Sequence, residues 1–243
     1  GSWLTGAFGN TGDGHQMGLA VGAAEDEFPH AIMLDPEQLM PYLRVNKLGE
    51  RFTPEYEPYG HLALAIQAQP GTYDFYVVDS AIGEKIDKIW TPSSSCYGPK
   101  EVWTAAAMSE KALKADTLEE LAKLMEVPEA QFVATIERWN EMAAAGKDED
   151  FNFPGEMMMT IDTPPYYATK EFADGLCTAG GLLVDTECRV LDKDRQPIDG
   201  LFAIGLTSGG MFFNTYPHNL NCLSHTRNCL MGYTVGQVLG DKA

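Results

Sequence analysis

Short apolar runs, turns and a long helical stretch follow one another in the last third of the chain. Leu182–Val184 and Arg189–Leu191 have the composition of short strands, and we expect them to form a hairpin. Leu201–Ile204 predicts another buried strand, and a helix is expected from about Leu223 to Leu239. Polar stretches predict turns at 192–196 and 197–200. A glycine-rich loop lies between the last strand and the helix, and this order lets backbone N–H groups face a ligand.

The middle of the chain alternates between helical and strand-like patterns. Phe132, Ile136 and Trp139 recur at helical spacing and predict one buried helix face. Thr117 begins a capping-box pattern and predicts a second helix just before it. The other elements expected here are strands at 43–45, 73–78 and 164–168, helices at 55–69 and 79–90, and a loop at 90–103.

Composition and charge narrow the range of partners. The chain has 243 residues, a formal net charge of -18 and a pI near 4.5. Such an acidic chain repels nucleic-acid phosphates and anionic lipids, so we expect neither as a partner. The sequence has no run of about twenty apolar residues, so no transmembrane segment is expected. The five cysteines are odd in number and include no C-x-x-C pair, so reduced thiols are expected rather than disulfides or a zinc site.

Several motifs occur in a fixed order and together carry a family resemblance. The C-terminal ones are Thr178-Ala179-Gly180-Gly181-Leu182, the strand from Pro197 to Gly205, Gly209-Gly210, and Gly232-Tyr233-Thr234-Val235-Gly236. The earlier ones are Thr11-Gly12-Asp13-Gly14, a V-N-x-x-G-x-R-F segment at 45–52, and Pro164-Pro165-Tyr166-Tyr167-Ala168. This set resembles the fumarate reductase/succinate dehydrogenase flavoprotein family, which includes the ketosteroid dehydrogenases.

The resemblance implies an α+β fold in which a substrate-capping domain is inserted between segments of an α/β flavin-binding domain. The expected domains are 1–24 and 175–243 for the flavin-binding domain and 25–174 for the cap. The N-terminal dinucleotide-binding βαβ unit with G-x-G-x-x-G is missing, so the chain corresponds to the C-terminal half of a typical member. A separate N-terminal FAD-binding half or an electron-donor protein is therefore an expected partner. The location is left open, with a soluble protein of the bacterial cytoplasm and an exported protein with a missing N-terminal signal as the two possibilities.

The resemblance also implies FAD as the cofactor. It assigns flavin contacts to Asp13, Gly205, Leu206, Gly209, Gly210, Ser224 and His225. From the residues alone, Asp13 or Thr11 could equally serve as a helix cap. A metal site built on His218 and His225 is not expected, because their spacing across a loop suits metal binding poorly.

For the reaction, the resemblance implies hydride transfer between FAD and an activated C=C bond, with a side chain giving or taking the proton. By residue count from Arg51-Phe52, Tyr59 occupies the acid/base position, and His61 is the second candidate. The substrate-binding residues implied are Cys177, Thr178 and Tyr216. Cys177 and Tyr216 stand where fumarate reductases have a His and an Arg that bind carboxylates.

We therefore expect a small-molecule enone, enoate or steroid-like substrate rather than fumarate. The alternative is an isolated cap fragment without activity that serves as a structural or interaction domain. Flavin absorbance of the purified chain distinguishes the two.

Overall fold

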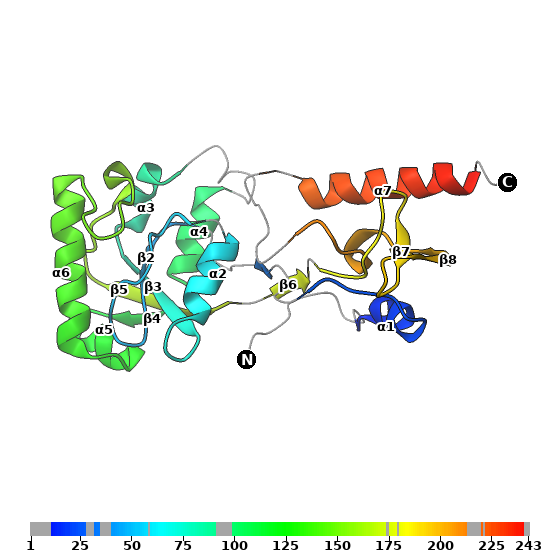
Figure 1. Ribbon diagram of the computed structural model, residues 1–243. Helices are drawn as coiled ribbons and strands as arrows, with labels where there is room; N and C mark the ends of the chain where they lie inside the picture. The colour runs from blue at the N-terminus through cyan, green and yellow to red at the C-terminus, as the bar shows by residue number, and fades with distance from the viewer. Residues whose placement is uncertain are drawn as a thin grey trace. The chain divides into compact units, whose positions relative to one another are not determined.

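The computed structural model describes residues 11–27, 32–34, 40–57, 59–90, 99–173, 175–178, 180–212, 220 and 222–240; of 32–34, 59 and 175–178 it describes the backbone alone. In these residues the chain is a mixed α/β structure with small antiparallel sheets (Figure 1). It divides into two compact units. We call them unit 1, mainly residues 36–57 and 61–173, and unit 2, residues 2–35, 58–60 and 174–243.

Unit 1 is built around a four-stranded antiparallel sheet with the order β2-β3-β5-β4. Its strands are β2 (Leu43–Val45), β3 (Tyr73–Asp79), β4 (Leu113–Ala115) and β5 (Tyr166–Phe172). The central pair is long, with Tyr73 opposite Phe172 and Asp79 opposite Tyr166. Successive side chains of a strand point to opposite faces, and β3 is buried on both.

Helices cover both faces of this sheet (Figure 1). On one side lie α5 (Leu118–Met125) and α6 (Glu129–Ala145), and on the other α2 (Tyr59–Gln67) and α4 (Lys100–Ala107). The connections include α3 (Ile82–Lys85) and the 3-10 turns η1 (Ile86–Lys88) and η3 (Gly155–Met157). The result is a three-layer unit whose sheet is enclosed by its own helices.

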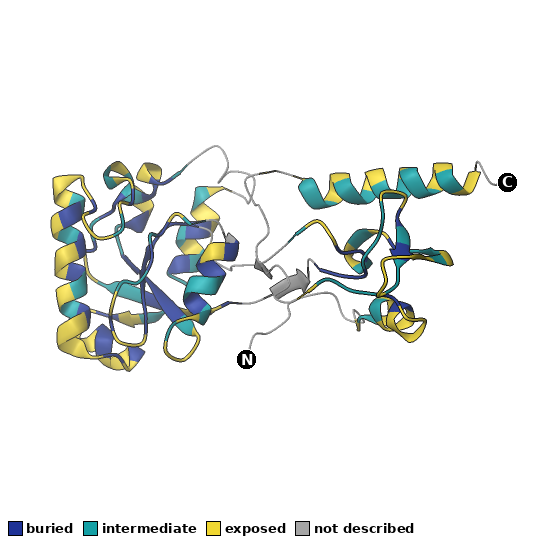
Figure 2. Cartoon of the chain, viewed as in Figure 1, coloured by how far each residue is buried: buried dark blue, intermediate teal, exposed yellow. Residues whose placement is uncertain are grey.

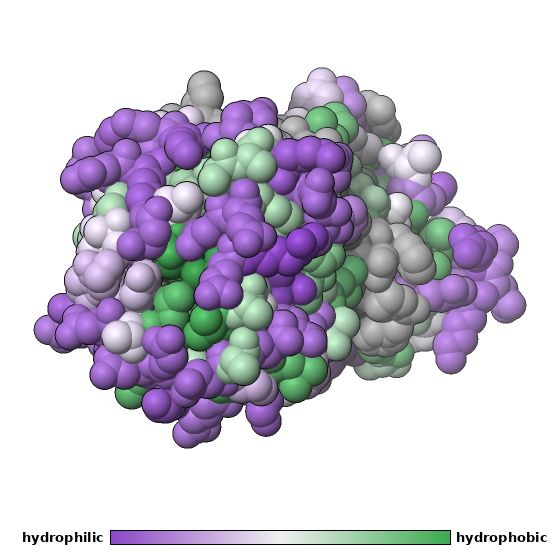
Figure 3. Space-filling view, turned by 90° about the vertical axis from the view of Figure 1, so that its left-hand side faces the viewer, coloured by the Kyte–Doolittle hydropathy of each residue, from purple (hydrophilic) through white to green (hydrophobic). Residues whose placement is uncertain are grey.

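Among the described residues, apolar clusters lie on both faces of the unit 1 sheet. The α5/α6 cluster contains Phe75 and Val77 from the sheet and Phe132, Ile136 and Trp139 from α6. The cluster on the opposite face contains Tyr42, Tyr76, Val78, Ile82, Ile86 and Trp103. On α6, buried and exposed positions alternate at helical spacing (Figure 2), and the outer face of unit 1 is mostly hydrophilic with a few apolar side chains (Figure 3).

The described residues of unit 2 form short strands and two α-helices. Its strands form two pairs: β1 (Ile32–Leu34) with β6 (Gly175–Thr178), and β7 (Arg189–Leu191) with β8 (Pro197–Phe202). The helices are α1 (Asp13–Ala20) and α7 (Leu223–Gly240), and a 3-10 turn, η4 (Gly205–Thr207), follows β8. β1 and β6 run antiparallel with Ile32 opposite Thr178, so the segments that lead into and out of unit 1 lie side by side.

The apolar core of unit 2 is small in the residues that the structure describes. Its buried cluster consists of Ala23, Leu182, Val190 and Ala203. No residue of α7 is buried (Figure 2), and Leu230 and Tyr233 are 62% and 65% exposed. In the described part of unit 2, the longest helix, α7, therefore lacks a buried apolar face like that of α6.

Most predicted elements are confirmed, and some are wrong in ways that have local reasons. The helix ending at Gly146, the Thr117 cap and the helix from Leu223 are present, and the Thr117 hydroxyl accepts a hydrogen bond from the Glu120 N–H. The loop predicted at 90–103 is wrong from Lys100, where α4 begins; residues 91–98 lie outside the described part. The turn predicted at 197–200 is wrong, because these residues form the start of β8.

The predicted hairpin is only partly correct. Val184 bridges Val190 as expected, but the main partner of β7 is β8, joined to it through the turn at 192–196. Leu201–Ile204 is less buried than predicted, with Ile204 40% exposed. A short apolar run does not reveal which neighbour will cover it, so the partner of each strand could not be read from the run alone.

Candidate functional site

The Gly205–Gly210 loop is a tight turn that hydrogen-bonds to the Gly181-Leu182 segment. The Leu182 N–H donates to the Thr207 carbonyl at 2.9 Å, and the Gly209 N–H donates to the Leu182 carbonyl at 2.8 Å. Within the loop, the Ser208 hydroxyl donates to the Gly205 carbonyl at 2.8 Å. The two glycine motifs predicted from the sequence are thus joined directly by backbone hydrogen bonds.

The α1 helix contacts the same loop. His15 Nε2 lies 3.2 Å from the Leu206 carbonyl oxygen, and a Cβ at Gly14 would come within 2.9 Å of the Thr207 side chain. Asp13 is the first residue of α1, is exposed, and accepts a hydrogen bond from the Thr11 hydroxyl. The capping interpretation of Asp13 or Thr11 is wrong, because Gly12 is the N-cap and no side chain caps the helix.

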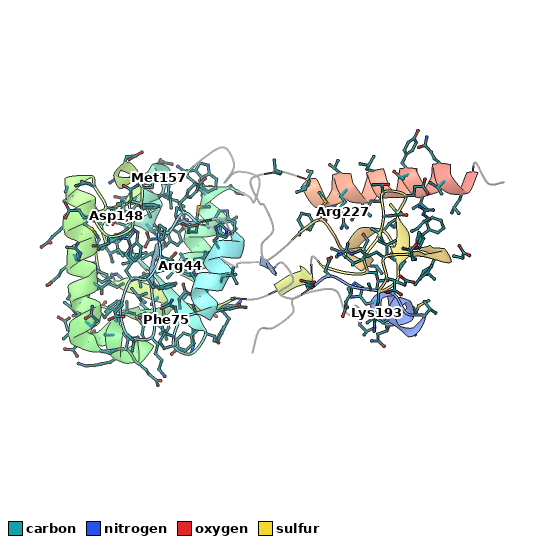
Figure 4. All side chains as sticks on the ribbon, in the orientation of Figure 1. Arg44, Phe75, Asp148, Met157, Lys193 and Arg227 are labelled. Atoms are coloured by element: carbon teal, nitrogen blue, oxygen red, sulfur yellow. The ribbon has the colours of Figure 1, made fainter. Side chains whose placement is uncertain are left out.

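Arg227 on α7 binds the carbonyl side of the loop (Figure 4). Its Nη1 donates to the Gly205 carbonyl at 3.1 Å, and its Nη2 donates to the carbonyls of Ser208 and Gly209 at 3.0 and 3.1 Å. Nη2 also donates to the Ser208 hydroxyl at 2.8 Å. Burial lowers the pKa of Arg227, yet a guanidinium keeps its charge in proteins. The sequence analysis did not select this residue.

Asp26 binds the amide side of the loop. Its carboxylate accepts from the Gly210 N–H at 3.0 and 2.9 Å and from the Gly181 N–H at 3.2 Å. A Cβ at Gly209 would lie 2.1 Å from Asp26 Oδ2, and one at Gly181 would lie 2.5 Å from the Thr207 carbonyl oxygen. Glycine is therefore required at both positions by close packing within unit 2. Asp26 was also missed by the sequence analysis.

The predicted cofactor-facing residues come from three segments that the structure brings together. The residues around Asp13 and those around Ser224 reach the loop through His15 and Arg227 respectively. Ser224 is half-buried and His225 is exposed, both in the first turn of α7. Asn228, one turn further on, lies beside Gly205. Their roles toward a cofactor stay predictions.

The predicted acid/base and substrate residues are described less completely. Tyr59 is the first residue of α2, and its side chain lies outside the described part. The His61 side chain is 55% exposed, with Nδ1 3.5 Å from Glu57 Oε2. Cys177 and Thr178 are in β6, where only the backbone is described, and Tyr216 lies outside the described residues.

The turn before Tyr59 is fixed by a buried ion network. Arg51 binds both carboxylate oxygens of Glu55 at 2.8 and 2.6 Å and both of Asp148 at 2.7 and 2.8 Å. Its guanidinium also lies over the rings of Trp139 and Phe151. The network therefore joins the segment at 51–55, a few residues before Tyr59 in the sequence, to the loop that follows α6.

Glu55 is the carboxylate of this network whose charged form is disfavoured. Burial raises its pKa to about 7, even though its hydrogen bonds to Arg51 favour the charged form. Arg51 and backbone N–H groups, by contrast, hold the pKa of Asp148 below its usual range against the opposing effect of burial. One cation thus binds two buried carboxylates, and their pKa values shift in opposite directions.

A second buried ion network lies within the sheet of unit 1. Arg44 Nη1 donates to Asp74 Oδ2 and to Glu171 Oε2, each at 2.8 Å. Asp74 and Glu171 stand opposite each other on β3 and β5, and burial raises the pKa of Asp74. This network was not expected from the sequence, because its members are separated by 30 and 127 positions.

Two kinds of feature are absent from the residues that the structure describes. No group of His, Cys, Asp and Glu side chains there could hold a metal ion. None of the helices described is long and apolar enough to cross a membrane.

Comparison with known proteins assigns the family. The sequence model of the FAD binding domain family matches residues 1–223. The chain belongs to this family. The relatives are dehydrogenases and reductases that act on CH–CH groups, and the family cofactor is FAD. The resemblance found in the sequence motifs is thereby confirmed.

Three similar proteins illustrate the range of the family. The 4-oxocyclohexanecarboxylate 2-dehydrogenase of Sinomonas cyclohexanicum is 27% identical over 97% of this chain and 41% of its own length. The probable fumarate reductase of Shewanella frigidimarina is 32% identical over 82% of this chain and 30% of its own length. The crystal structure of 3-ketosteroid delta1-dehydrogenase from Sterolibacterium denitrificans matches all of this chain and 49% of its own, with a TM-score of 0.79 and 24% identity.

These matches show the fold and the extent of the chain. The chain spans less than half the length of the relatives it matches. At 24% identity, the structural likeness to the ketosteroid dehydrogenase is evidence of fold alone. The fold prediction is therefore confirmed as a mixed α/β structure similar to FAD-dependent dehydrogenases.

The residues around the Gly205–Gly210 loop fit a flavin. The loop has no charged side chain, and a Cβ at Gly210 would meet no atom within 4 Å. Beside Gly205, the Oδ1 atom of Asn228 is buried and has no hydrogen-bond partner in the structure. A neutral backbone surface with a spare acceptor suits a planar ring that bears its own carbonyl and N–H groups.

Proposed function

We propose that this chain is part of an FAD-dependent oxidoreductase that moves a hydride between FAD and a carbon–carbon bond conjugated to a carbonyl. The observation that carries the proposal is the meeting of α1, the Gly205–Gly210 loop and the first turns of α7 in unit 2. These segments hold the residues for which the family resemblance implies flavin contacts. Bound FAD would supply the hydride chemistry.

The two units then have separate roles. We assign unit 1 to the substrate-capping domain and unit 2 to segments of the flavin-binding domain. The pairing of β1 with β6 supports this assignment, because an inserted domain needs its entry and exit strands close together. The ion network of Arg51, Glu55 and Asp148 would make the cap rigid where it leads to Tyr59.

In the proposed reaction, Tyr59 gives or takes the proton and Tyr216 orients the substrate carbonyl. A tyrosine hydroxyl can do this only within hydrogen-bond reach of the reacting carbon or oxygen. A rigid turn before Tyr59 serves that requirement, because a small displacement of an acid/base group is costly in rate. His61, whose side chain is exposed, is the weaker candidate for the same role.

The positively charged side chains of unit 2 are engaged within the unit or lie in an exposed turn. This favours an uncharged substrate that is bound by neutral hydrogen bonds. Between residues 180 and 240, the cationic side chains in the described part are Arg189, Lys193, Arg195 and Arg227. Arg227 is engaged by loop carbonyls, and Arg189 by Asp185 at 2.7 Å. Lys193 and Arg195 belong to the exposed β7–β8 turn. An enone or steroid-like ketone therefore suits this unit better than a dicarboxylate such as fumarate.

The exposed apolar side chains of unit 2 support a further partner. Met17 on α1 and Val21, directly after this helix, are 72% and 59% exposed, and Leu230 and Tyr233 on α7 are 62% and 65% exposed. We propose that these helices pack against further residues of a flavin-binding domain. The matched relatives are longer than the part that this chain covers.

The test of function is FAD binding followed by a tyrosine variant. This chain, with the remaining flavin-domain half supplied in trans, is expected to bind FAD and show its visible absorbance. Tyr59→Phe should lower turnover of an enone substrate about a hundred- to ten-thousand-fold while the flavin stays bound and reducible. Tyr56→Phe is the matched control, because Tyr56 is three residues earlier and 58% exposed.

Three outcomes would count against the proposal. A colourless reconstituted protein would favour the alternative, in which the chain is a fragment without activity that serves as a structural or interaction domain. Normal turnover by Tyr59→Phe would remove Tyr59 and shift the role to His61. Efficient reduction of fumarate would overturn the substrate class.

A further inference from the structure

Asp26 and Arg227 contact the Gly205–Gly210 loop through two different sets of backbone atoms. Asp26 accepts from the N–H groups of Gly181 and Gly210. Arg227 donates to the carbonyls of Gly205, Ser208 and Gly209. The carboxylate thus accepts hydrogen bonds and the guanidinium donates them, as the chemistry of each group requires. We call this arrangement the Asp26–Arg227 clamp.

We propose that the Asp26–Arg227 clamp fixes the Gly205–Gly210 loop in the shape in which it receives FAD. The inference rests on the proposed function for the identity of the ligand. It adds two positioning residues, which act on the cofactor through the loop backbone rather than by touching it.

The clamp adds charge-assisted hydrogen bonds to the neutral ones that join the loop to the Gly181-Leu182 segment. The loop sequence, Gly-Leu-Thr-Ser-Gly-Gly, includes three glycines, and Leu206 is 38% exposed. Glycine has more backbone freedom to lose than any other residue, so an unsupported loop of this composition would sample many shapes. Charge-assisted hydrogen bonds are about twice as strong as neutral ones and offset that loss.

The two residues also connect the loop to distant segments. Asp26 follows α1 and its own N–H donates to the Gly181 carbonyl at 2.9 Å, so it ties the start of the chain to the Gly180-Gly181 segment. Arg227 comes from the second turn of α7. A preformed loop raises ligand affinity because the ordering entropy is lost on folding rather than on binding.

The geometry explains why lysine would be a poor substitute for Arg227. The guanidinium spans three carbonyls and one hydroxyl through two nitrogen atoms in a fixed plane. A lysine keeps the positive charge but presents a single nitrogen, which cannot reach the same set. Arg227→Lys should therefore restore only part of what Arg227→Met removes.

The experiment compares four forms of this chain: the unaltered protein, Arg227→Met, Arg227→Lys and Arg189→Met. Arg189 is the control, because it is an arginine of the same unit that binds the Asp185 carboxylate instead of the loop. Amide hydrogen exchange of Gly209 and Gly210 reports the loop without any cofactor. FAD titration in the presence of the flavin-domain half measures the affinity for the cofactor.

The clamp predicts a graded result. Arg227→Met should speed exchange at Gly209 and Gly210 and weaken FAD binding by about tenfold or more, since several charge-assisted hydrogen bonds are lost. Arg227→Lys should fall between it and the unaltered protein, and Arg189→Met should match the unaltered protein. Unfolding of unit 1 should be the same in all four, which shows that the variants fold.

Two results would overturn the clamp. Unchanged exchange at Gly209 and Gly210 in Arg227→Met would show that Arg227 does not fix the loop. FAD affinity within twofold of the unaltered protein would show that the fixed shape does not matter to the cofactor. Failure of the unaltered protein to bind FAD would instead refute the proposed function. The exchange result would then still test whether Arg227 fixes the loop.

Discussion

Units 1 and 2 are stabilised by different kinds of interaction. Unit 1 encloses its sheet between helices, with apolar clusters on both faces and ion networks buried among them. In its described residues, unit 2 has a core of a few side chains and is held mainly by backbone hydrogen bonds, by Asp26 and by Arg227. A helix such as α6 gains most of its stability from its buried face, and α7 has no such face in the described part.

This difference indicates which unit depends on something further. Unit 1 has the features of a domain that folds by itself, which the capping role that we propose for it requires. Unit 2 has exposed apolar side chains on both helices and a glycine loop that is open on one side. We infer that unit 2 is completed by FAD and by more of the flavin-binding domain.

The largest expected effect is on the ion network of unit 1. Arg51→Met leaves the buried carboxylates of Glu55 and Asp148 without their cation, and breaking such a pair typically costs about 3–5 kcal/mol. Denaturant unfolding of the chain measures the loss. Arg138→Met is the matched control, because Arg138 binds Asp150 in the same loop but is 52% exposed, and it should change unfolding little. Equal effects of the two variants would refute the structural role of the network.

An intermediate effect is expected from pH. Because burial raises the pKa of Glu55 from 4.5 to about 7, the folded state binds a proton that the unfolded state releases between these values. The stability that this group contributes is therefore present below about pH 4.5 and is lost as pH rises to about 7, on the order of 3 kcal/mol in total. Glu55→Gln should remove this decline from unfolding curves measured across the range. A decline of the same size in the variant would show that another group titrates.

The smallest effect is expected on α7 of unit 2. Leu230→Ser and Tyr233→Ser should alter the unfolding of this chain by less than about 0.5 kcal/mol, because both side chains are exposed. The same variants should weaken association with the flavin-domain half, which binding in trans can measure. Ile136→Ala on α6 is the contrast, because that side chain is fully buried and its loss should destabilise unit 1 strongly. Unimpaired association of both α7 variants would remove α7 from the interface.

The sequence predicted those features whose cause lies within a few residues. The α6 face and the Thr117 cap follow from local spacing, and the family motifs placed the Gly205–Gly210 loop beside a helix. Asp26 and Arg227 could not be found in this way, because their partners are backbone atoms of a distant loop. Arg44 was likewise hidden, because a charged residue in a strand normally indicates an exposed face, and here two distant carboxylates neutralise it.

The most direct test of the account is hydrogen exchange of α6 and α7 in the same sample, before and after FAD and the flavin-domain half are added. In this chain alone, α6 should be strongly protected and α7 weakly protected, because only α6 has a buried face. On completion with FAD, protection of α7 should rise while that of α6 stays the same. Strong protection of α7 in the chain alone, or no gain on addition of FAD and the flavin-domain half, would contradict the claim that unit 2 is completed by them.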